Sequence, residues 1–212
     1  MDLDPITAAS FATIDREIGP HPWGWCYPEY VIIRRVIHAT GDFSFKHLIH
    51  FSPHAIELGI RALRRGAPVV TDVGLVAQAI KAHLTTHLPN PLMNALELAT
   101  TPADGETRAA TGMEQALRQY PQAVVVIGNA PTALIKLCQL LPDLPAPPAL
   151  VVGAPVGFVR VLEAKAMLNQ TTLPRIWVAG RRGGSPVAAA ITNALIDLAV
   201  SEPPHQATRR AD

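Results

Sequence analysis

The sequence predicts an α/β fold, a Rossmann-like, mainly parallel sheet flanked by helices, with an N-terminal helical segment. Three observations support this prediction. From Lys46 onward, short apolar runs alternate regularly with runs of helical periodicity. The apolar runs are continuous, as expected for strands that are covered on both faces. Glycine-rich or polar segments follow four of these runs, where a strand turns into a helix.

Two helices are expected before the alternation begins. Residues 7–18 have apolar side chains at helical spacing, and the next ten residues interrupt the pattern with prolines and glycines. A second helix is predicted over residues 28–39, because Pro28 suits a first turn and Gly41 is well placed to end it. His38 therefore lies at a helix end, where it either favours the helix dipole or points into a site as an acid.

The alternating part of the chain is expected to form six strands and six helices. The strands are predicted at residues 46–51, 67–73, 90–98, 122–128, 148–153 and 174–180. The helices are predicted at residues 53–66, 74–84, 105–120, 130–141, 158–170 and 185–200. Without an internal repeat or a clear linker, residues 1–200 are expected to be one domain, and residues 201–212 a polar tail.

Composition excludes several classes of protein. The 212 residues are 49% hydrophobic and 17% charged, which is a globular composition. The net charge of +1 does not favour binding to nucleic acid or to an anionic membrane. No apolar run approaches the roughly 18 residues of a membrane span, and the acidic N-terminus is not a signal peptide. Two distant cysteines, Cys26 and Cys138, indicate a reducing compartment, so a cytoplasmic protein is expected.

Four strand exits are the candidate ligand-binding segments. They read "TDVG", "GNAPT", "GAPVGF" and "GRRGGS" and should meet at the carboxyl edge of the sheet, where parallel sheets bind ligands. Small residues there can expose backbone N–H groups at helix N-termini, which bind phosphate or carboxylate. Glycine at such a turn is also often required by geometry alone.

Three other chemistries fit poorly. No G-x-G-x-x-G follows the first strand and no P-loop occurs, which argues against a dinucleotide site. His47 and His50 should face opposite sides of a strand, and His83 and His87 lack a third ligand, so no metal site is expected. A G-x-S-x-G elbow is missing, and Ser185 is expected to cap the last helix.

Several segments together are similar to one enzyme family. "VIHATGDF", "TRAATG", "IGNAPTAL", "VVGAPVGFVRVLEAKAML" and "VAGRRGGSPVAAAITNAL" resemble the precorrin-8X methylmutase family in order and spacing, from about residue 6 to 198. The resemblance implies an isomerase of cobalamin biosynthesis that moves a methyl group from C-11 to C-12 of precorrin-8X or cobalt-precorrin-8. The product would be hydrogenobyrinate or cobyrinate. It also implies no cofactor, and a homodimer with its sites near the subunit interface.

The resemblance assigns roles to particular residues. His38 matches the catalytic histidine, which would donate a proton to the macrocycle, and an imidazole suits this because its pKa lies near neutrality. The candidate substrate-binding residues are Ser10, Thr107, Arg108, Gly128, Asn129, Ala130, Pro131, Thr132, Gly153, Pro155, Val156, Gly157, Phe158, Arg181, Gly183, Gly184 and Ser185.

Some of these assignments have alternatives. Arg108 suits a carboxylate of the substrate, and a surface ion pair is the other interpretation. Either Arg181 or its neighbour Arg182 could face the site. Glu163 and Lys165 lie two residues apart on a predicted helix, so they should face different sides and support the helix or the dimer surface.

The alternative function is a non-catalytic tetrapyrrole-binding or carrier protein of the same pathway, and a nucleotide-binding domain is a third hypothesis. Ala9 and Gly74 differ from the residues that the family often has, which affects the fit of the substrate. Whether the substrate carries cobalt is not decided by the sequence.

Overall fold

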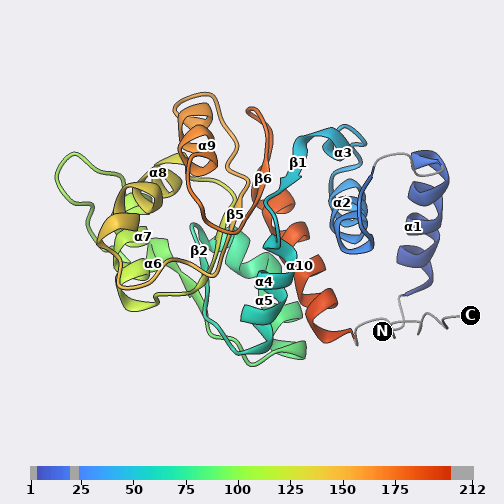
Figure 1. The fold of residues 1–212 in the computed structure, drawn as a ribbon, viewed down its shortest axis with the longest axis horizontal. Coiled ribbons are helices and arrows are strands. Elements are labelled where there is room, and N and C mark those ends of the chain that lie inside the picture. The colour runs from blue at the N-terminus through green and yellow to red at the C-terminus, as the bar shows by residue number, and fades with distance from the viewer. Residues whose placement is uncertain (1–3, 20–23, 202–212) are drawn as a thin grey trace, which may run out of the picture.

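The centre of the molecule is a six-stranded sheet, seen in a computed structural model that describes residues 4–19 and 24–201 (Figure 1). The strand order is β1-β6-β5-β4-β2-β3, and every neighbouring pair is parallel except β1 with β6. The strands are β1 (Ile49–Phe51), β2 (Val69–Thr71), β3 (Leu92–Asn94), β4 (Val124–Ile127), β5 (Leu150–Gly153) and β6 (Arg175–Val178). The predicted α/β fold and mainly parallel sheet are confirmed.

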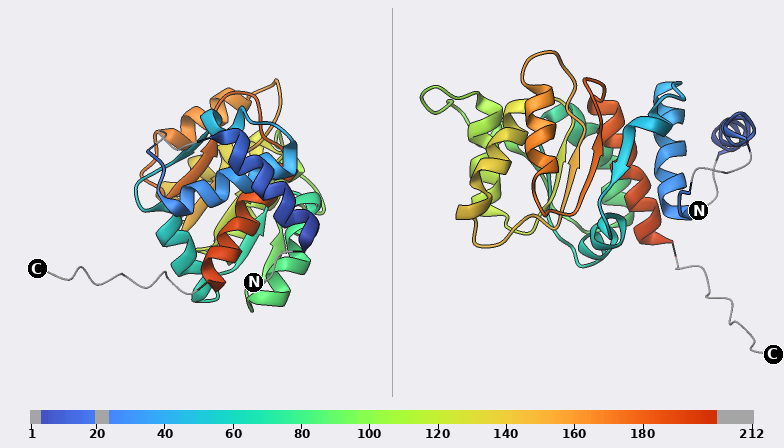
Figure 2. Two further views of the ribbon diagram at one scale, coloured as in Figure 1. Left: turned by 90° about the vertical axis from the view of Figure 1, so that its right-hand side faces the viewer. Right: turned by 45° about the horizontal axis from the view of Figure 1, so that its top comes forward.

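Helices cover both faces of this sheet (Figures 1 and 2). The helices are α1 (Pro5–Ile18), α2 (Tyr27–Thr40), α3 (Phe45–Leu48), α4 (Ala55–Arg64), α5 (Gly74–His87), α6 (Ala95–Leu98), α7 (Arg108–Gln119), α8 (Pro131–Leu140), the 3-10 turn η1 (Leu141–Asp143), α9 (Val161–Asn169) and α10 (Ser185–Val200). Helices α4, α5 and α10 lie on one face, and α6 to α9 lie on the other. Helix α2 packs on α10, and α1 lies outermost against α2.

Strand β4 shows why the strands are apolar throughout. Val124 and Val126 belong to the core shared with α10, while Val125 and Ile127 belong to the core shared with α8. All four side chains are fully buried, because successive residues point to opposite faces and both faces are covered. Full burial of such a side chain contributes about 1.5–3 kcal/mol.

The two predicted N-terminal helices are present, although α1 begins two residues before its predicted start and α2 extends one residue further at each end. Asp4 caps α1 by accepting hydrogen bonds from the N–H groups of Ile6 and Thr7. Gly41 ends α2 in the left-handed conformation, with a φ of 64°. Asp15 of α1 contacts Arg34 of α2 in an ion pair of 3.0 Å, which ties the outer helix to the body.

Three element boundaries differ from the prediction. Residues 45–48 form a short helix in place of the start of a strand, because Asp42 accepts the N–H of Ser44 and turns the chain there. The segment 90–98 is a three-residue strand followed by α6. Helix α9 begins only at Val161, because Arg160 has a φ of 59° and cannot continue a helix.

The tail predicted from residue 201 onward lies outside the described residues after Ser201. Within the described part of the chain, no helix has the length and apolar character that a membrane crossing requires.

Candidate active site

Four parallel strands release their connecting segments at one edge of the sheet. Strands β6, β5, β4 and β2 lie side by side in the sheet in that order, and each pairs in parallel with the next. The glycine-rich or polar exits predicted from the sequence therefore gather at this carboxyl edge, and α5, α8, α9 and α10 all begin there. This is the edge where α/β sheets place their ligands.

The turn from β4 into α8 is already occupied by a side chain of the protein. The buried carboxylate of Asp72 fills it. This carboxylate accepts hydrogen bonds from the N–H groups of Gly128 at 3.1 Å, Asn129 at 2.7 Å and Ala130 at 2.7 Å. Burial raises the pKa of Asp72, and the three N–H groups oppose that rise because they stabilise the charged form. The expectation that this turn presents free backbone donors is therefore wrong.

The segment after β5 is half buried and half exposed. Gly153 and Pro155 are buried, and a Cβ on Gly153 would lie 2.5 Å from the side chain of Leu168. Packing therefore explains this glycine. Val156 is 41% exposed and Phe158 is 85% exposed, so the apolar part of this exit faces solvent at the carboxyl edge.

Close packing also explains the glycines after β6. Gly183 has a φ of 147°, and a Cβ there would lie 2.3 Å from the carbonyl oxygen of Ala154. Gly184 donates its N–H to the same oxygen at 2.9 Å and is the N-cap residue of α10. The prediction that Ser185 caps this helix is wrong, because Ser185 is its buried first residue and its side chain makes no capping bond.

The two arginines of this turn have different partners. The guanidinium of Arg181 lies over the ring of Phe158, 5.7 Å from the ring centroid, which is within cation–π range. The guanidinium of Arg182 instead contacts the Asp42 carboxylate and the Ser44 hydroxyl, beyond the end of α2. Arg181 is therefore the arginine left beside the exposed aromatic residue.

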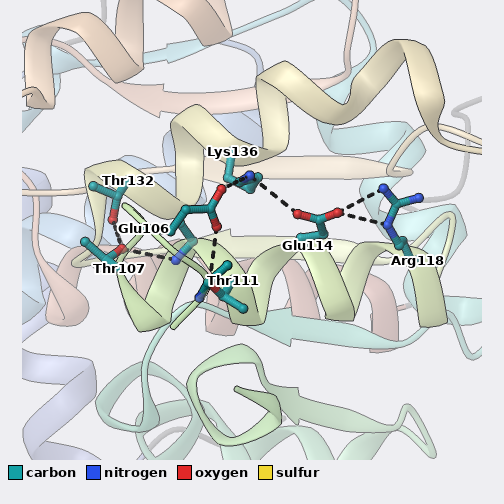
Figure 3. Close-up of polar contacts among 9 residues, drawn as sticks. Glu106, Thr107, Thr111, Glu114, Arg118, Thr132 and Lys136 are labelled. Atoms are coloured by element: carbon teal, nitrogen blue, oxygen red, sulfur yellow. Dashed lines mark hydrogen bonds and ion pairs between the residues drawn. The ribbon is translucent and has the colours of Figure 1, made fainter. Parts of the chain in front are cut away.

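Thr107 and Thr132 join the N-termini of α7 and α8 (Figure 3). Their hydroxyl oxygens lie 2.7 Å apart, and Thr107 also caps α7 by accepting the N–H of Ala110. Pro131 opens α8 beside them. The structure thus brings together two candidate residues that are 25 positions apart in the chain.

Arg108 makes contacts that neither sequence interpretation included. Its Nε donates to the carbonyl oxygen of Ala99 at 3.1 Å, and its Nη2 donates to that of Leu96 at 3.0 Å. It forms no ion pair with any described residue. The residue is exposed, and its remaining N–H groups have no hydrogen-bond partner among the described residues.

A network of charged side chains lies beside these threonines, and the sequence analysis did not predict it (Figure 3). Lys136 of α8 contacts Glu106 and lies 3.4 Å from Glu114, which itself pairs with Arg118 at 2.9 Å. The bond to Glu106 raises the pKa of Lys136, and the bond from Arg118 lowers the pKa of Glu114. Glu114 and Arg118 have the i,i+4 spacing that the sequence could have revealed. The contact between Lys136 and Glu106 depends on the packing of α7 against α8.

Ser10 and His38 line the same groove between α1 and α2. The groove has a volume of about 670 Å³, and Gly41 and Phe43 also line it. The exposed ring of His38 packs edge-on against Phe11, with centroids 5.2 Å apart. Among the described residues, the ring nitrogens of His38 have no hydrogen-bond partner, so they are open to a ligand in the groove. Asp42, between the groove residues Gly41 and Phe43, contacts Arg182 of the turn after β6. The groove therefore ends beside the carboxyl edge of the sheet.

The histidine pairs do not form a metal centre with other described residues. His47 lies in α3 and His50 in β1, where its ring stacks on Trp177. His83 and His87 do share a helical face, and His83 lies 2.6 Å from Asp197. In residues 4–19 and 24–201, no three His, Cys, Asp or Glu side chains are grouped as metal ligands.

A mainly parallel sheet with apolar, basic and hydroxyl groups at its carboxyl edge, beside a groove with an exposed histidine, defines an α/β protein with a candidate enzyme active site. The precorrin-8X methylmutase family model matches residues 5–198. A cobalt-precorrin-8 methylmutase of Synechocystis sp. is 47% identical, over 93% of this chain and 97% of that protein. A precorrin-8X methylmutase of Pseudomonas aeruginosa is 43% identical, over 76% of this chain and 80% of that protein. A crystal structure of precorrin-8X methylmutase from Thermus thermophilus matches with a TM-score of 0.81 and 38% identity, over 92% of this chain and 98% of that one.

The chain belongs to the precorrin-8X methylmutase family. The resemblance found in the sequence is thereby confirmed, and so is the class of enzyme it predicts, an isomerase.

Proposed function

We propose that this protein moves a methyl group from C-11 to C-12 of precorrin-8X or cobalt-precorrin-8, giving hydrogenobyrinate or cobyrinate. The observation that carries the proposal is that an exposed histidine, His38, shares a groove with Ser10 in a chain of this family. The reaction is an isomerisation, so it needs no electron donor or acceptor.

His38 is the proton donor in this proposal. Protonation of the conjugated ring system makes the methyl shift easier and favours the tautomer that is trapped as product. The ring of His38 is held by Phe11, while its nitrogens have no bond to another described residue. A general acid must direct its N–H at the substrate and not at the protein, and ring nitrogens without a bond to another described residue support this role.

The substrate carries acetate and propionate groups around an apolar ring, and the carboxyl edge offers partners for both parts. Phe158 and Val156 supply exposed apolar surface for the ring. Arg181, beside Phe158, and the unbonded N–H groups of the exposed Arg108 are suited to carboxylates. The hydroxyl of Thr132, with its partner Thr107, adds a neutral donor.

We also propose that the protein is a homodimer. Several large apolar side chains outside the proposed substrate surface are exposed, among them Val159 at 78%, Tyr27 at 69% and Leu75 at 66%. A second copy that covers part of this surface would bury it, and a specific dimer should bury more than about 1,000 Å² in total. Sedimentation at micromolar concentration should show twice the chain mass of 22.7 kDa, and a monomer throughout would contradict the proposal.

The proposed location is the cytoplasm. Cys26 and Cys138 are both free thiols, which suits a reducing compartment. Burial raises the pKa of Cys138 to about 11, so it stays protonated and unreactive at neutral pH.

Residues 1–200 act as one domain in this proposal, and residues 201–212 as a polar tail. Both hydrophobic cores share one sheet, which supports a single folding unit.

One experiment tests the function directly. Purified protein is mixed with precorrin-8X and, separately, with cobalt-precorrin-8, and the visible spectrum and the product mass-fragmentation pattern are followed. We expect a product of unchanged mass with the spectrum of hydrogenobyrinate or cobyrinate. A spectrum that shifts on binding but never reaches that of the product, with unreacted substrate recovered, would identify a carrier protein instead.

A further inference from the structure

Lys165 of α9 is a buried cation that the proposed reaction does not use. Its side chain is 4% exposed, and it has no acidic partner among the described residues. Its Nζ donates at 2.7 Å to the carbonyl oxygen of Gly180 and at 2.7 Å to that of Arg182. The sequence predicted that Lys165 supports the helix or the dimer surface, and in the structure its side chain crosses from α9 to the turn between β6 and α10.

A buried ammonium without a counterion is costly, and an apolar side chain of similar length would avoid that cost. Burial lowers the pKa of Lys165 to about 8. The two carbonyl oxygens oppose that shift because they bind the charged form. The ammonium therefore has a local task, which is to fix two carbonyl groups of one turn.

That turn reaches in two directions. Toward α2, Arg182 contacts Asp42 and Ser44, and its guanidinium lies over the ring of Phe45 at 5.1 Å. Asp42 follows directly on Gly41, which ends the helix that carries His38. A continuous set of contacts thus runs from α9 through the turn to the end of α2.

Toward β5, the same turn holds the exposed apolar segment. The carbonyl oxygen of Arg181 accepts the N–H of Gly157 at 3.2 Å, and the Arg181 side chain lies over Phe158. The turn therefore contacts both the segment that follows the helix with the proposed acid and the surface proposed for the ring.

We infer that Lys165 is a positioning residue, which acts through the turn 180–184 and the Arg182–Asp42 pair to hold the His38 end of α2 against the substrate surface around Phe158. This inference rests on the proposed function. It assigns no contact between Lys165 and the substrate.

The test compares Lys165→Met with Asp42→Asn, the double variant, and Lys81→Met as a control, since Lys81 is an exposed lysine of α5. At matched folded fraction, Lys165→Met should lower kcat at least ten-fold and change the dissociation constant of the product less than three-fold. Asp42→Asn should also lower kcat, and the double variant should lose no more than the larger single loss, because both changes break one set of contacts. Lys81→Met should have the kcat of the wild type.

Multiplicative losses in the double variant, or a kcat of Lys165→Met within two-fold of wild type, would overturn the inference. If Lys165→Met does not fold, Asp42→Asn decides, because the Asp42 side chain is only partly buried and the change is nearly isosteric. A normal kcat in that variant overturns the inference. Hydrogen exchange gives a readout that does not depend on turnover. The backbone amides of residues 41–45 should exchange at least ten-fold faster in Lys165→Met than in the wild type, and at the wild-type rate in Lys81→Met. This expectation holds even if the proposed function fails. Unchanged exchange in both variants would overturn the inference.

Discussion

The carboxylate of Asp72 accepts a hydrogen bond of 2.7 Å from the backbone N–H of Ala130, and so occupies the turn that the sequence assigned to an anionic ligand. This bond joins the end of β2 to the start of α8. The turn is thereby fixed before any substrate binds, and substrate recognition depends on neighbouring side chains.

Replacing Asp72 tests how much that contact contributes. Asp72→Asn removes the charge and places an amide N–H₂ group toward backbone N–H groups. We expect the free energy of unfolding to fall by about 1.5–3 kcal/mol, the contribution of a hydrogen bond to a charged group. Urea unfolding measures this, with Asp143→Asn as control because Asp143 is exposed. Equal stability of the two variants would show that the Asp72 contacts are not important for folding.

His38→Asn tests the proposed acid. Asparagine keeps a polar side chain of similar size but cannot deliver a proton at neutral pH. The rate of the chemical step should fall by at least about 10²-fold, while the melting temperature and substrate binding stay near those of wild type. Stopped-flow spectra measure the rate. His54→Asn is the matched control, because His54 is exposed and its φ of 60° is tolerated by asparagine. Conversion by His38→Asn within a few-fold of wild type would exclude the role.

Arg108→Ala separates binding from folding. If the remaining N–H groups of Arg108 contact a substrate carboxylate, the variant should weaken substrate binding by roughly 1.5–3 kcal/mol. Arg108→Lys should recover only part of this, because a lysine lacks the planar fork. Titration with product at matched folded fraction measures the effect, since loss of the bonds to Ala99 and Leu96 also lowers stability. An unchanged dissociation constant would assign Arg108 to folding alone.

The buried ammonium of Lys165 predicts a pH dependence of stability. Burial lowers its pKa to about 8, while the unfolded chain has the ordinary value near 10.5. Between these values the unfolded state holds more protons, so rising pH stabilises the folded state. The stability of wild type relative to Lys165→Met should therefore increase between pH 8 and pH 10.5, by up to about 3 kcal/mol. Urea unfolding at pH 7.5 and pH 10 measures it, and a constant difference would mean that the two carbonyl groups keep the lysine charged throughout.

Turnover should not depend on a metal ion. The methyl shift is an isomerisation, and the sequence offers no set of residues with metal-ligand spacing. We expect the full rate after dialysis against a chelator, measured with both substrates. Loss of the rate, restored by a divalent ion, would contradict this.

The sequence by itself determined the fold class, the family and most of the elements. Runs such as Val124–Ile127 are apolar at every position, and only a strand covered on both faces requires that pattern. Gly41 marks the end of α2 through local chemistry that a few neighbouring residues decide. His38 could be identified as a candidate because its motif is contiguous.

Tertiary structure decided which polar groups are free to bind a ligand and which already have a hydrogen-bond or ion-pair partner within the protein. The contacts of Asp72 with residues 128–130, of Arg182 with Asp42, and of Lys165 with the turn at residue 180 join segments separated by 15 to 140 positions. No local pattern indicates such a partner, because a side chain's partner depends on how strands and helices pack and not on its neighbours in the chain. For the same reason, the glycines at residues 153 and 183 looked like ligand contacts in the sequence, while in the structure Gly153 packs against the side chain of Leu168 and backbone packing requires the glycine at residue 183.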